Sequence, residues 1–335
     1  MKNLGYYALI MICIIVIIPL LIVKGCGVET DEIIPHGKQN LAGAENIKIK
    51  VYIASDKNVK EMNLDEYIKG VVAAEMPADF EPEALKAQAV AARTYAYGRL
   101  KNIYKSADGV HDGTPVCTNP AHCQAWISKK AAMKKWGIFK ASGYWNKIEK
   151  AVNETEGIII TYQGSVVNPL FHSNSGGKTE NAENVWPGVT VPYLKSVVSE
   201  GEELSGEFKS VTNIGINDFY NTIKKHYPNA QINKKYIIGS IKIEGYTQGG
   251  RVKNIKIGNI ELRGTEFRTL FSLRSANFKI EKKDSRTLKI TTIGNGHGVG
   301  MSQWGANYLA KNGGNYDEIL KYYYTGVQIS NISGQ

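Results

Sequence analysis

Alternation of apolar and polar residues marks the first element of the folded part of this chain. Residues 47–53, IKIKVYI, alternate with period two, as a half-buried strand does. Residues 64–74 then place apolar side chains at helical spacing, and Asn63 and Glu66 stand where a capping box would start that helix. Pro77 cannot continue a helix, so we expect a helix that ends before it.

Further patterns predict the remaining elements. An Ala-rich, closely packed helix is expected from Pro82 to about Tyr104, and a hairpin over residues 157–167. A short helix is expected over residues 218–226. A last helix is expected from Asn315, with Glu318 in the position of a capping box.

The pattern of apolar and polar residues is different between residues 201 and 288. Short alternating strands separated by glycine turns dominate there, without a cluster of catalytic side chains. We therefore predict the α+β class. A larger body spans residues 47–200 and 289–335, and a smaller strand-rich lobe spans residues 201–288.

The N-terminus has a different character. Tyr6 to Val23 is an uncharged apolar run of 18 residues between two lysines, about the minimum for a spanning helix, and no small-residue cleavage site follows. We predict a transmembrane anchor over residues 1–24 and a polar tether over residues 25–46. The body would then lie outside the cytoplasm.

The net charge of +10 raises the question of a polyanionic partner. The lysines are scattered, and no basic block interleaves with aromatic residues, so we do not expect nucleic acid. An exported protein would instead meet the cell wall, whose carboxylates and phosphates make it a polyanion.

Glu75 is the candidate general acid. It stands among small and apolar residues in VVAAEMP, and a carboxyl group held among such neighbours is desolvated, which favours its protonated form. The alternative is a glutamate at a helix end that faces solvent. Arg93, flanked by alanines, could clamp a carboxylate, orient Glu75 or form a structural ion pair.

Two cysteines and two histidines lie within 13 residues, a density typical of metal ligands. His111, Cys117 and Cys123 are the preferred zinc ligands, whereas His122 adjoins Cys123 and would often point elsewhere. The spacing matches no standard zinc finger. A disulfide between Cys117 and Cys123 is the alternative that an exported location permits, and a nucleophilic thiol ranks last.

Two loops have the chemistry of a saccharide site. FHSNSGGKTEN, from Phe171, is dense in hydroxyls, amides and glycines, although a satisfied cluster of turns would have the same composition. Between Gly294 and Gly305 five glycines surround His297, Gln303 and Trp304. Glycine at that density predicts positive φ or close approach of the backbone to a ligand.

Three motifs, VVAAEMP with QAVAARTYA, then FHSNSGGKTENAENVW, then GHGVGMSQWGA, resemble the stage II sporulation protein D family, also called the amidase-enhancer domain. The resemblance covers about residues 47–330. It implies a membrane-anchored lytic transglycosylase that cleaves peptidoglycan strands lacking stem peptides during engulfment, in the mother cell of a sporulating bacterium. It further implies two partners, the amidase stage II sporulation protein P and the membrane protein stage II sporulation protein M.

The resemblance also assigns site residues. It places the catalytic glutamate at Glu75. The substrate-binding positions that it implies are Arg93, Ser173, Ser175, Gly176, Gly177, His297, Gln303 and Trp304. The Cys/His segment is not a general motif of the family, so zinc rests on spacing alone.

A hydrolytic glycosidase normally needs two carboxylates, and only one stands in a motif here. A lytic transglycosylase manages with one, because the sugar's own 6-hydroxyl attacks its anomeric carbon and no water has to be activated. Two other functions stay open. One is a non-catalytic glycan-binding activator of a cell-wall amidase, and the other is a zinc-dependent amide hydrolase.

Overall fold

The computed structural model describes residues 47–104 and 113–334. Within these ranges no helix is long and apolar enough to cross a membrane. The predicted anchor and tether (residues 1–46) and the candidate ligand His111 lie outside the described residues. The described residues belong to one compact unit, and they are mixed α and β, as the sequence predicts.

The chain enters the fold through a small sheet. β1 (Lys48–Ile53) pairs antiparallel with β2 (Asn58–Asn63) and parallel with β3 (Val116–Cys117). The alternation predicted for β1 is confirmed: Ile49, Val51 and Ile53 are buried, because every second side chain points to the same face.

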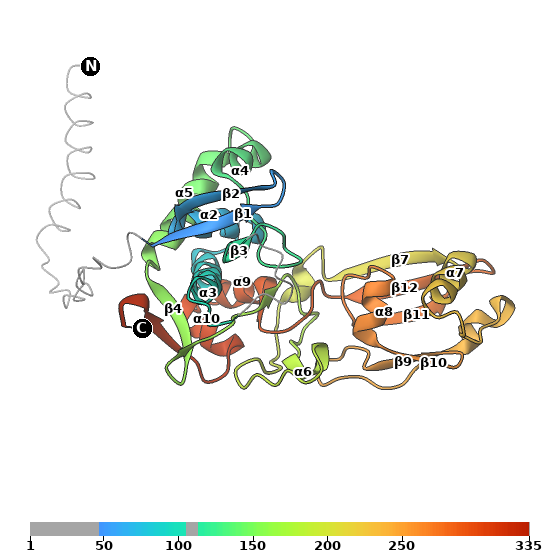
Figure 1. Cartoon of the computed structure of the whole chain (residues 1–335). Helices are drawn as coiled ribbons and strands as arrows, with labels where there is room; N and C mark the ends of the chain where they lie inside the picture. The colour runs from blue at the N-terminus through green and yellow to red at the C-terminus, as the bar shows by residue number, and fades with distance from the viewer. Residues whose placement is uncertain (1–46, 105–112, 335) are drawn as a thin grey trace, which may run out of the picture. The chain divides into compact units, whose positions relative to one another are not determined.

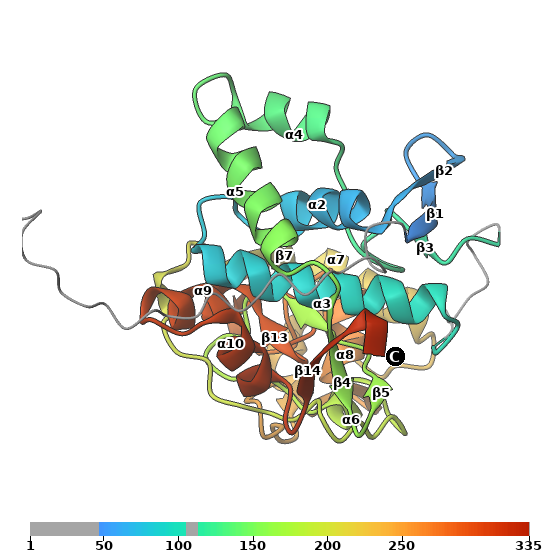
Figure 2. The ribbon, with the colours of Figure 1, turned by 90° about the vertical axis from the view of Figure 1, so that its left-hand side faces the viewer.

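The central element is α3 (Pro82–Leu100), which packs against helices on both sides (Figure 2). On one side lie α2 (Leu64–Glu75) and α5 (Ala141–Glu154), and on the other α9 (Gln303–Lys311) and α10 (Tyr316–Tyr323). The alanines of α3 are buried around its circumference, and their small side chains let the neighbouring helices approach closely.

α3 ends four residues before the predicted Tyr104. Asn102 adopts a left-handed backbone conformation, with φ 55°. Ile103 N donates a hydrogen bond to Gly98 O, and Asn102 N donates one to Arg99 O. These two hydrogen bonds form a Schellman motif, which satisfies the last carbonyls of the helix and turns the chain away.

The two predicted capping boxes have different outcomes. At α10, Asn315 and Glu318 form the box. At α2, Asn63 makes no side-chain cap, and that part of the prediction was wrong. Asn63 is also the last residue of β2, and the Glu66 carboxylate is instead bound by Lys69 Nζ at 2.6 Å.

The hairpin predicted over residues 157–167 is confirmed as β4 (Ile158–Tyr162) and β5 (Ser165–Val166), and β14 (Gln328–Asn331) pairs with β4. A short parallel pair, β6 (Phe171–His172) and β13 (Met301–Ser302), brings together two distant segments of the chain. The body is completed by α4 (Lys129–Trp136), α6 (Ala182–Val185), η1 (Glu202–Leu204) and η3 (Ile332–Gly334).

The strand-rich lobe has its own apolar core and two three-stranded antiparallel sheets, in the orders β10-β9-β8 and β11-β12-β7 (Figure 1, yellow to orange). Its elements are β7 (Lys209–Gly215), α7 (Ile216–His226), η2 (Lys234–Ser240), β8 (Ile241–Ile243), β9 (Asn254–Ile257), β10 (Ile260–Arg263), α8 (Gly264–Leu270), β11 (Phe278–Lys282) and β12 (Thr287–Ile293). Leu288 and Ile290 of β12 both pack in this core.

Candidate active site

Glu75 is the last residue of α2 and lines a cleft of about 460 Å³. Its carboxylate is half-buried, and Oε1 accepts a hydrogen bond from the backbone N of Ala125 at 2.6 Å. Burial raises the pKa of Glu75 above its usual value, while hydrogen bonds from Ala125 N and the Gln303 side chain oppose part of that rise. The carboxyl group does not simply face solvent, and burial shifts it toward the protonated form that a general acid needs.

Three residues from the two recognised loops line the same cleft: Ser173, Gln303 and Trp304. The parallel pairing of β6 with β13 sets the two loops side by side, and α9 packs on α3. The Trp304 ring meets Phe80 edge to face, with centroids 4.8 Å apart. Gln303 Nε2 also donates to Gln88 Oε1 of α3 at 3.3 Å, which fixes its position beside Glu75.

The cleft contains residues that the sequence analysis did not single out. They are Asp79, Lys135, Trp136, Tyr144 and Glu207. Trp136 of α4 and Tyr144 of α5 pack edge to face at 5.7 Å, so the cleft has a second aromatic wall of the kind that sugar rings contact. The richness of residues 105–150 in Lys and Trp was the signal for this wall, but nothing in the sequence links it to Glu75.

Glu207 supplies a further carboxylate in this cleft, which Glu75 and Asp79 also line. Its Oε2 accepts hydrogen bonds from Ser173 Oγ at 3.0 Å and from Asn295 Nδ2 at 2.8 Å. Each recognised loop therefore contributes one donor, and the carboxylate is held in place. Glu207 lies in no motif, two residues before β7 begins, and the sequence gives no sign of its role there.

The rest of the Ser173 loop is turned inward. Ser175 Oγ donates to Glu202 Oε1 at 2.8 Å, and the backbone N of Gly176 and of Gly177 donate to Glu202 Oε2 at 2.7 and 3.3 Å. Glu202 is fully buried. The alternative of a satisfied turn cluster thus describes Ser175, Gly176 and Gly177 better than the predicted saccharide contact does.

The glycine run meets protein rather than an open ligand site. Gly298 adopts φ 87°, and a Cβ there would lie 2.0 Å from Arg251 Nη2. At Gly305 a Cβ would lie 2.1 Å from both Ser199 Oγ and Tyr323 Oη. Positive φ and close backbone approach, as predicted, explain the glycines, but the approaching groups are side chains of this chain.

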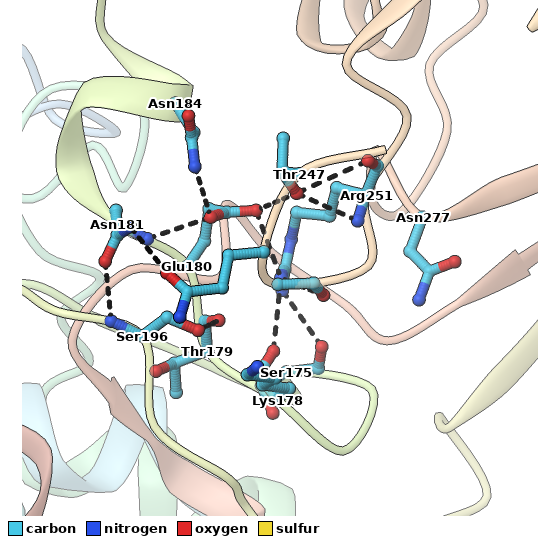
Figure 3. Close-up of polar contacts among 12 residues, drawn as sticks. Ser175, Lys178, Thr179, Glu180, Asn181, Asn184, Ser196, Thr247, Arg251 and Asn277 are labelled. Carbon is cyan, nitrogen blue, oxygen red and sulfur yellow. Dashed lines mark hydrogen bonds and ion pairs between the residues drawn. The ribbon is translucent and has the colours of Figure 1, made fainter. Parts of the chain in front are cut away.

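Arg251 is the centre of a buried polar network with Glu180 (Figure 3). Arg251 Nη2 donates to Ser175 O at 2.9 Å and Nη1 to Lys178 O at 3.1 Å. Glu180 Oε1 accepts from Asn184 Nδ2 at 2.7 Å, and its Oε2 accepts from Thr247 Oγ1. This network joins the strand-rich lobe to the loop that carries Ser173.

Arg93 does not orient Glu75 in this structure. Its Nε donates to Asp65 Oδ1 at 2.8 Å, and Nη2 donates to Val152 O at 3.0 Å. The side chain is 1% exposed, so it holds α3 to α2 and α5. These contacts match the alternative of a structural ion pair and do not match the predicted contact with substrate.

His297 lines a different cleft, together with Trp186. The ring of His297 lies 5.4 Å from the rings of both Trp186 and His172. Burial first, and then the nearby arginines, lower the pKa of His297 to about 4, so its imidazole is neutral near pH 7.

No disulfide joins Cys117 to Cys123, and their side chains are in hydrogen-bond contact with each other. Burial raises the pKa of the Cys117 thiol to about 11. Two adjacent thiols are suitable as part of a zinc ligand set. Among residues 47–104 and 113–334, however, no group of three or more potential ligands gathers, and His111 lies outside these ranges. Zinc therefore stays a prediction.

Comparisons with known proteins agree with the motifs. The family model described as Stage II sporulation protein matches residues 52–162. Stage II sporulation protein D of Bacillus subtilis (strain 168) is 36% identical over 98% of this chain and 96% of its own length. That of Bacillus amyloliquefaciens is 37% identical over 94% of this chain and 90% of its own. The protein named Amidase enhancer of Bacillus subtilis (strain 168) is 30% identical over 78% of this chain and 40% of its own length. The chain belongs to the stage II sporulation protein D family, a family of sporulation proteins.

Proposed function

We propose that this protein is a lytic transglycosylase that cleaves peptidoglycan strands lacking stem peptides during engulfment in sporulation. The observation that carries the proposal is the half-buried carboxyl of Glu75, with raised pKa, in a cleft lined by Trp304, Trp136 and Tyr144. Aromatic walls provide flat apolar surfaces for sugar rings, and the carboxyl group is the proton donor that glycosidic cleavage needs.

The reaction proceeds in two steps. Protonated Glu75 donates its proton to the glycosidic oxygen as the bond to C1 of muramic acid breaks, and positive charge develops at C1. The Glu75 carboxylate then takes the proton of the 6-hydroxyl, whose oxygen bonds to C1. The products are a strand with a free 4-hydroxyl and a 1,6-anhydro-muramic acid end, and Glu75 is again protonated.

Glu207 has a separate role in this proposal. Ser173 and Asn295 hold its carboxylate in the same cleft, which supports the proposal that Glu207 stabilises the positive charge that develops at C1. It activates no water, so the outcome remains an anhydro sugar.

One observation favours a second function. A relative that matches most of this chain carries the name Amidase enhancer. A protein of this family could therefore hold glycan and stimulate a cell-wall amidase without cutting the strand itself.

Mass spectrometry of the products decides between the two. Purified full-length protein is incubated with amidase-treated and with intact peptidoglycan, beside Glu75→Gln. Anhydro-muramic products from amidase-treated strands, absent with Glu75→Gln, support the transglycosylase. Glycan binding without products, together with faster release of peptides by an added amidase, overturns it in favour of the amidase activator.

The remaining assignments are part of the same proposal. Residues 1–24 anchor the protein in the membrane with its body outside the cytoplasm, facing the septal wall in the mother cell. The amidase stage II sporulation protein P supplies strands without stem peptides, and stage II sporulation protein M is the membrane partner. Zinc at His111, Cys117 and Cys123 is the proposed metal, with a role that is either structural or close to the active site.

A further inference from the structure

A second cleft, of about 750 Å³, is lined by residues of the body and of the strand-rich lobe. The body contributes Val185, Trp186 and His297, and the strand-rich lobe contributes α8 with the residues next to it and the end of α7. The mechanism proposed above uses none of these side chains, and the sequence analysis found no chemistry in this lobe.

The charged groups of this cleft are mostly cationic. Arg263 and Arg268 are the cations that line it, and Glu266 is the acidic residue among the lining residues. The Glu266 carboxylate already accepts from Arg263 N at 2.8 Å and lies 3.5 Å from Arg263 Nη2. Arg268 is therefore left without a compensating acid in the wall.

Arg268 is half-buried, and its Nε donates to Leu273 O at 3.2 Å. In the part of the chain that the structure describes, no carboxylate lies within ion-pair distance of its guanidinium. Its charge acts directly on His297, whose low pKa it helps to cause. A partly desolvated guanidinium beside a neutral ring, with no acid to pair, is a site for an anion.

Two other polar atoms of the wall also lack a partner. Arg263 Nη1 and Thr265 Oγ1 are buried without a hydrogen bond within the described residues. Buried polar groups normally have partners, so the described residues leave these two atoms of the wall unsatisfied. Trp186 adds an aromatic ring that is 37% exposed and packs beside His297. The cleft thus combines a flat face for a sugar with hydrogen-bond donors for an anion.

The glycine run contacts residues of both clefts. Asn295 donates to Glu207 in the cleft of Glu75, and His297, two residues later, lines the second cleft. The Cα atoms of residues two apart are at most ~7 Å from each other. The wall of the second cleft is therefore joined to the cleft of Glu75 through three consecutive residues of the chain.

We infer that this second cleft binds a sugar that carries a free carboxylate, with Arg268 on the carboxylate and Trp186 on the ring; this rests on the proposed function. In peptidoglycan such a group is the lactyl carboxylate of muramic acid, which is free only after the stem peptide has been removed. While the peptide is attached, the lactyl group is an uncharged amide. Arg268 would thus recognise the product of amide cleavage, the class of reaction that must supply this substrate.

The test measures binding by calorimetry in full-length Glu75→Gln protein, which cannot cleave its ligand under the proposed mechanism. Three muramic-acid oligosaccharides of equal length are compared: one with free lactyl carboxylates, one with these groups converted to methylamides, and one with stem peptides attached. We expect the free-carboxylate strand to bind about tenfold more tightly than the methylamide, as a charge-assisted hydrogen bond predicts. Arg268→Gln should abolish this preference and retain the affinity for the methylamide.

Control variants separate recognition from folding. Arg286→Gln removes an exposed arginine outside the cleft and should leave the preference unchanged. Arg268→Lys should keep part of it, and Trp186→Ala should weaken all three ligands alike. An unchanged preference in Arg268→Gln overturns the inference. Equally tight, Arg268-dependent binding of the strand with stem peptides overturns it too, because a peptide carboxylate would then be the ligand. Since no step requires turnover, failure of the cleavage proposal leaves these readings unaffected.

Discussion

The Glu180 carboxylate lies 3.9 Å from Arg251 Nη1, and neither side chain is more than 2% exposed. This pair is buried where the strand-rich lobe meets the Ser173 loop. Removing one member of a buried ion pair leaves the other charge without compensation, and such changes cost about 3–5 kcal/mol. Both the stability of the fold and the position of the Ser173 loop therefore depend on this pair.

We predict that Arg251→Ala lowers the free energy of unfolding by about 3–5 kcal/mol in urea denaturation. The control is Lys321→Ala, which breaks an exposed ion pair with Asp317 and should change stability by about 0.5 kcal/mol or less. A loss in Arg251→Ala no larger than in the control would contradict a structural role for the pair.

A glycine substitution tests the close approach to the same arginine. Gly298→Ala places a methyl group against the guanidinium of Arg251, whereas Gly313→Ala has a similar positive φ but open space around it. Both variants carry backbone strain of roughly 1 kcal/mol. We expect the melting temperature of Gly298→Ala to fall clearly more than that of Gly313→Ala. Equal decreases would show that Arg251 moves aside freely.

Glu75→Gln should abolish cleavage and, at neutral pH, stabilise the fold. Burial raises the pKa of Glu75 in the folded state, so the folded protein binds its proton more tightly than the unfolded chain does. Wild-type stability therefore falls as pH rises from the usual value of 4.5 through the folded pKa. The melting temperature of Glu75→Gln should exceed that of the wild type at pH 7, and this difference should shrink below about pH 4.

The same protonation controls activity. Glu75 must carry its proton to start the reaction, so kcat/KM should fall as pH rises through its folded pKa. Cleavage that keeps increasing across the neutral and alkaline range would argue against Glu75 as the acid.

Glu207→Gln should lower kcat by roughly tenfold to a hundredfold with a smaller change in KM, because the charge acts mainly on the transition state. Its neutral amide oxygen can still accept from Ser173 and Asn295. Glu203→Gln, an exposed neighbour, serves as the control. Product analysis that finds unchanged kcat in Glu207→Gln would remove Glu207 from the mechanism.

The zinc proposal predicts one equivalent of zinc in the purified full-length protein by elemental mass spectrometry. Cys117→Ser should lose the metal and lower the melting temperature, because a structural zinc stabilises the folded state. Chelation should leave the products of glycan cleavage unchanged in kind. Metal-free protein with a Cys117–Cys123 disulfide would contradict the proposal, and chelator-sensitive release of stem peptides would favour the amide hydrolase.

Much of the local structure follows from the sequence, because its causes are local. The alternation of β1, the Ala-rich α3, the hairpin of β4 and β5 and the capped start of α10 each depend on a few neighbouring side chains. Pro77 likewise predicts that α2 ends just before it, and Glu75 is indeed the last residue of this helix. The capping box at Asn63 failed where a strand contact competed with the local signal.

What the tertiary structure decided is which motif residues share a site. Ser173, Gln303 and Trp304 join Glu75 in one cleft, whereas Ser175, Gly176 and Gly177 enclose Glu202, and Arg93 binds Asp65. Glu207 and Arg268 could not be found from the sequence, because their partners come from segments far away along the chain. Residue type sets the chemistry available at each position, but only packing over long range determines which groups meet and which of them are desolvated.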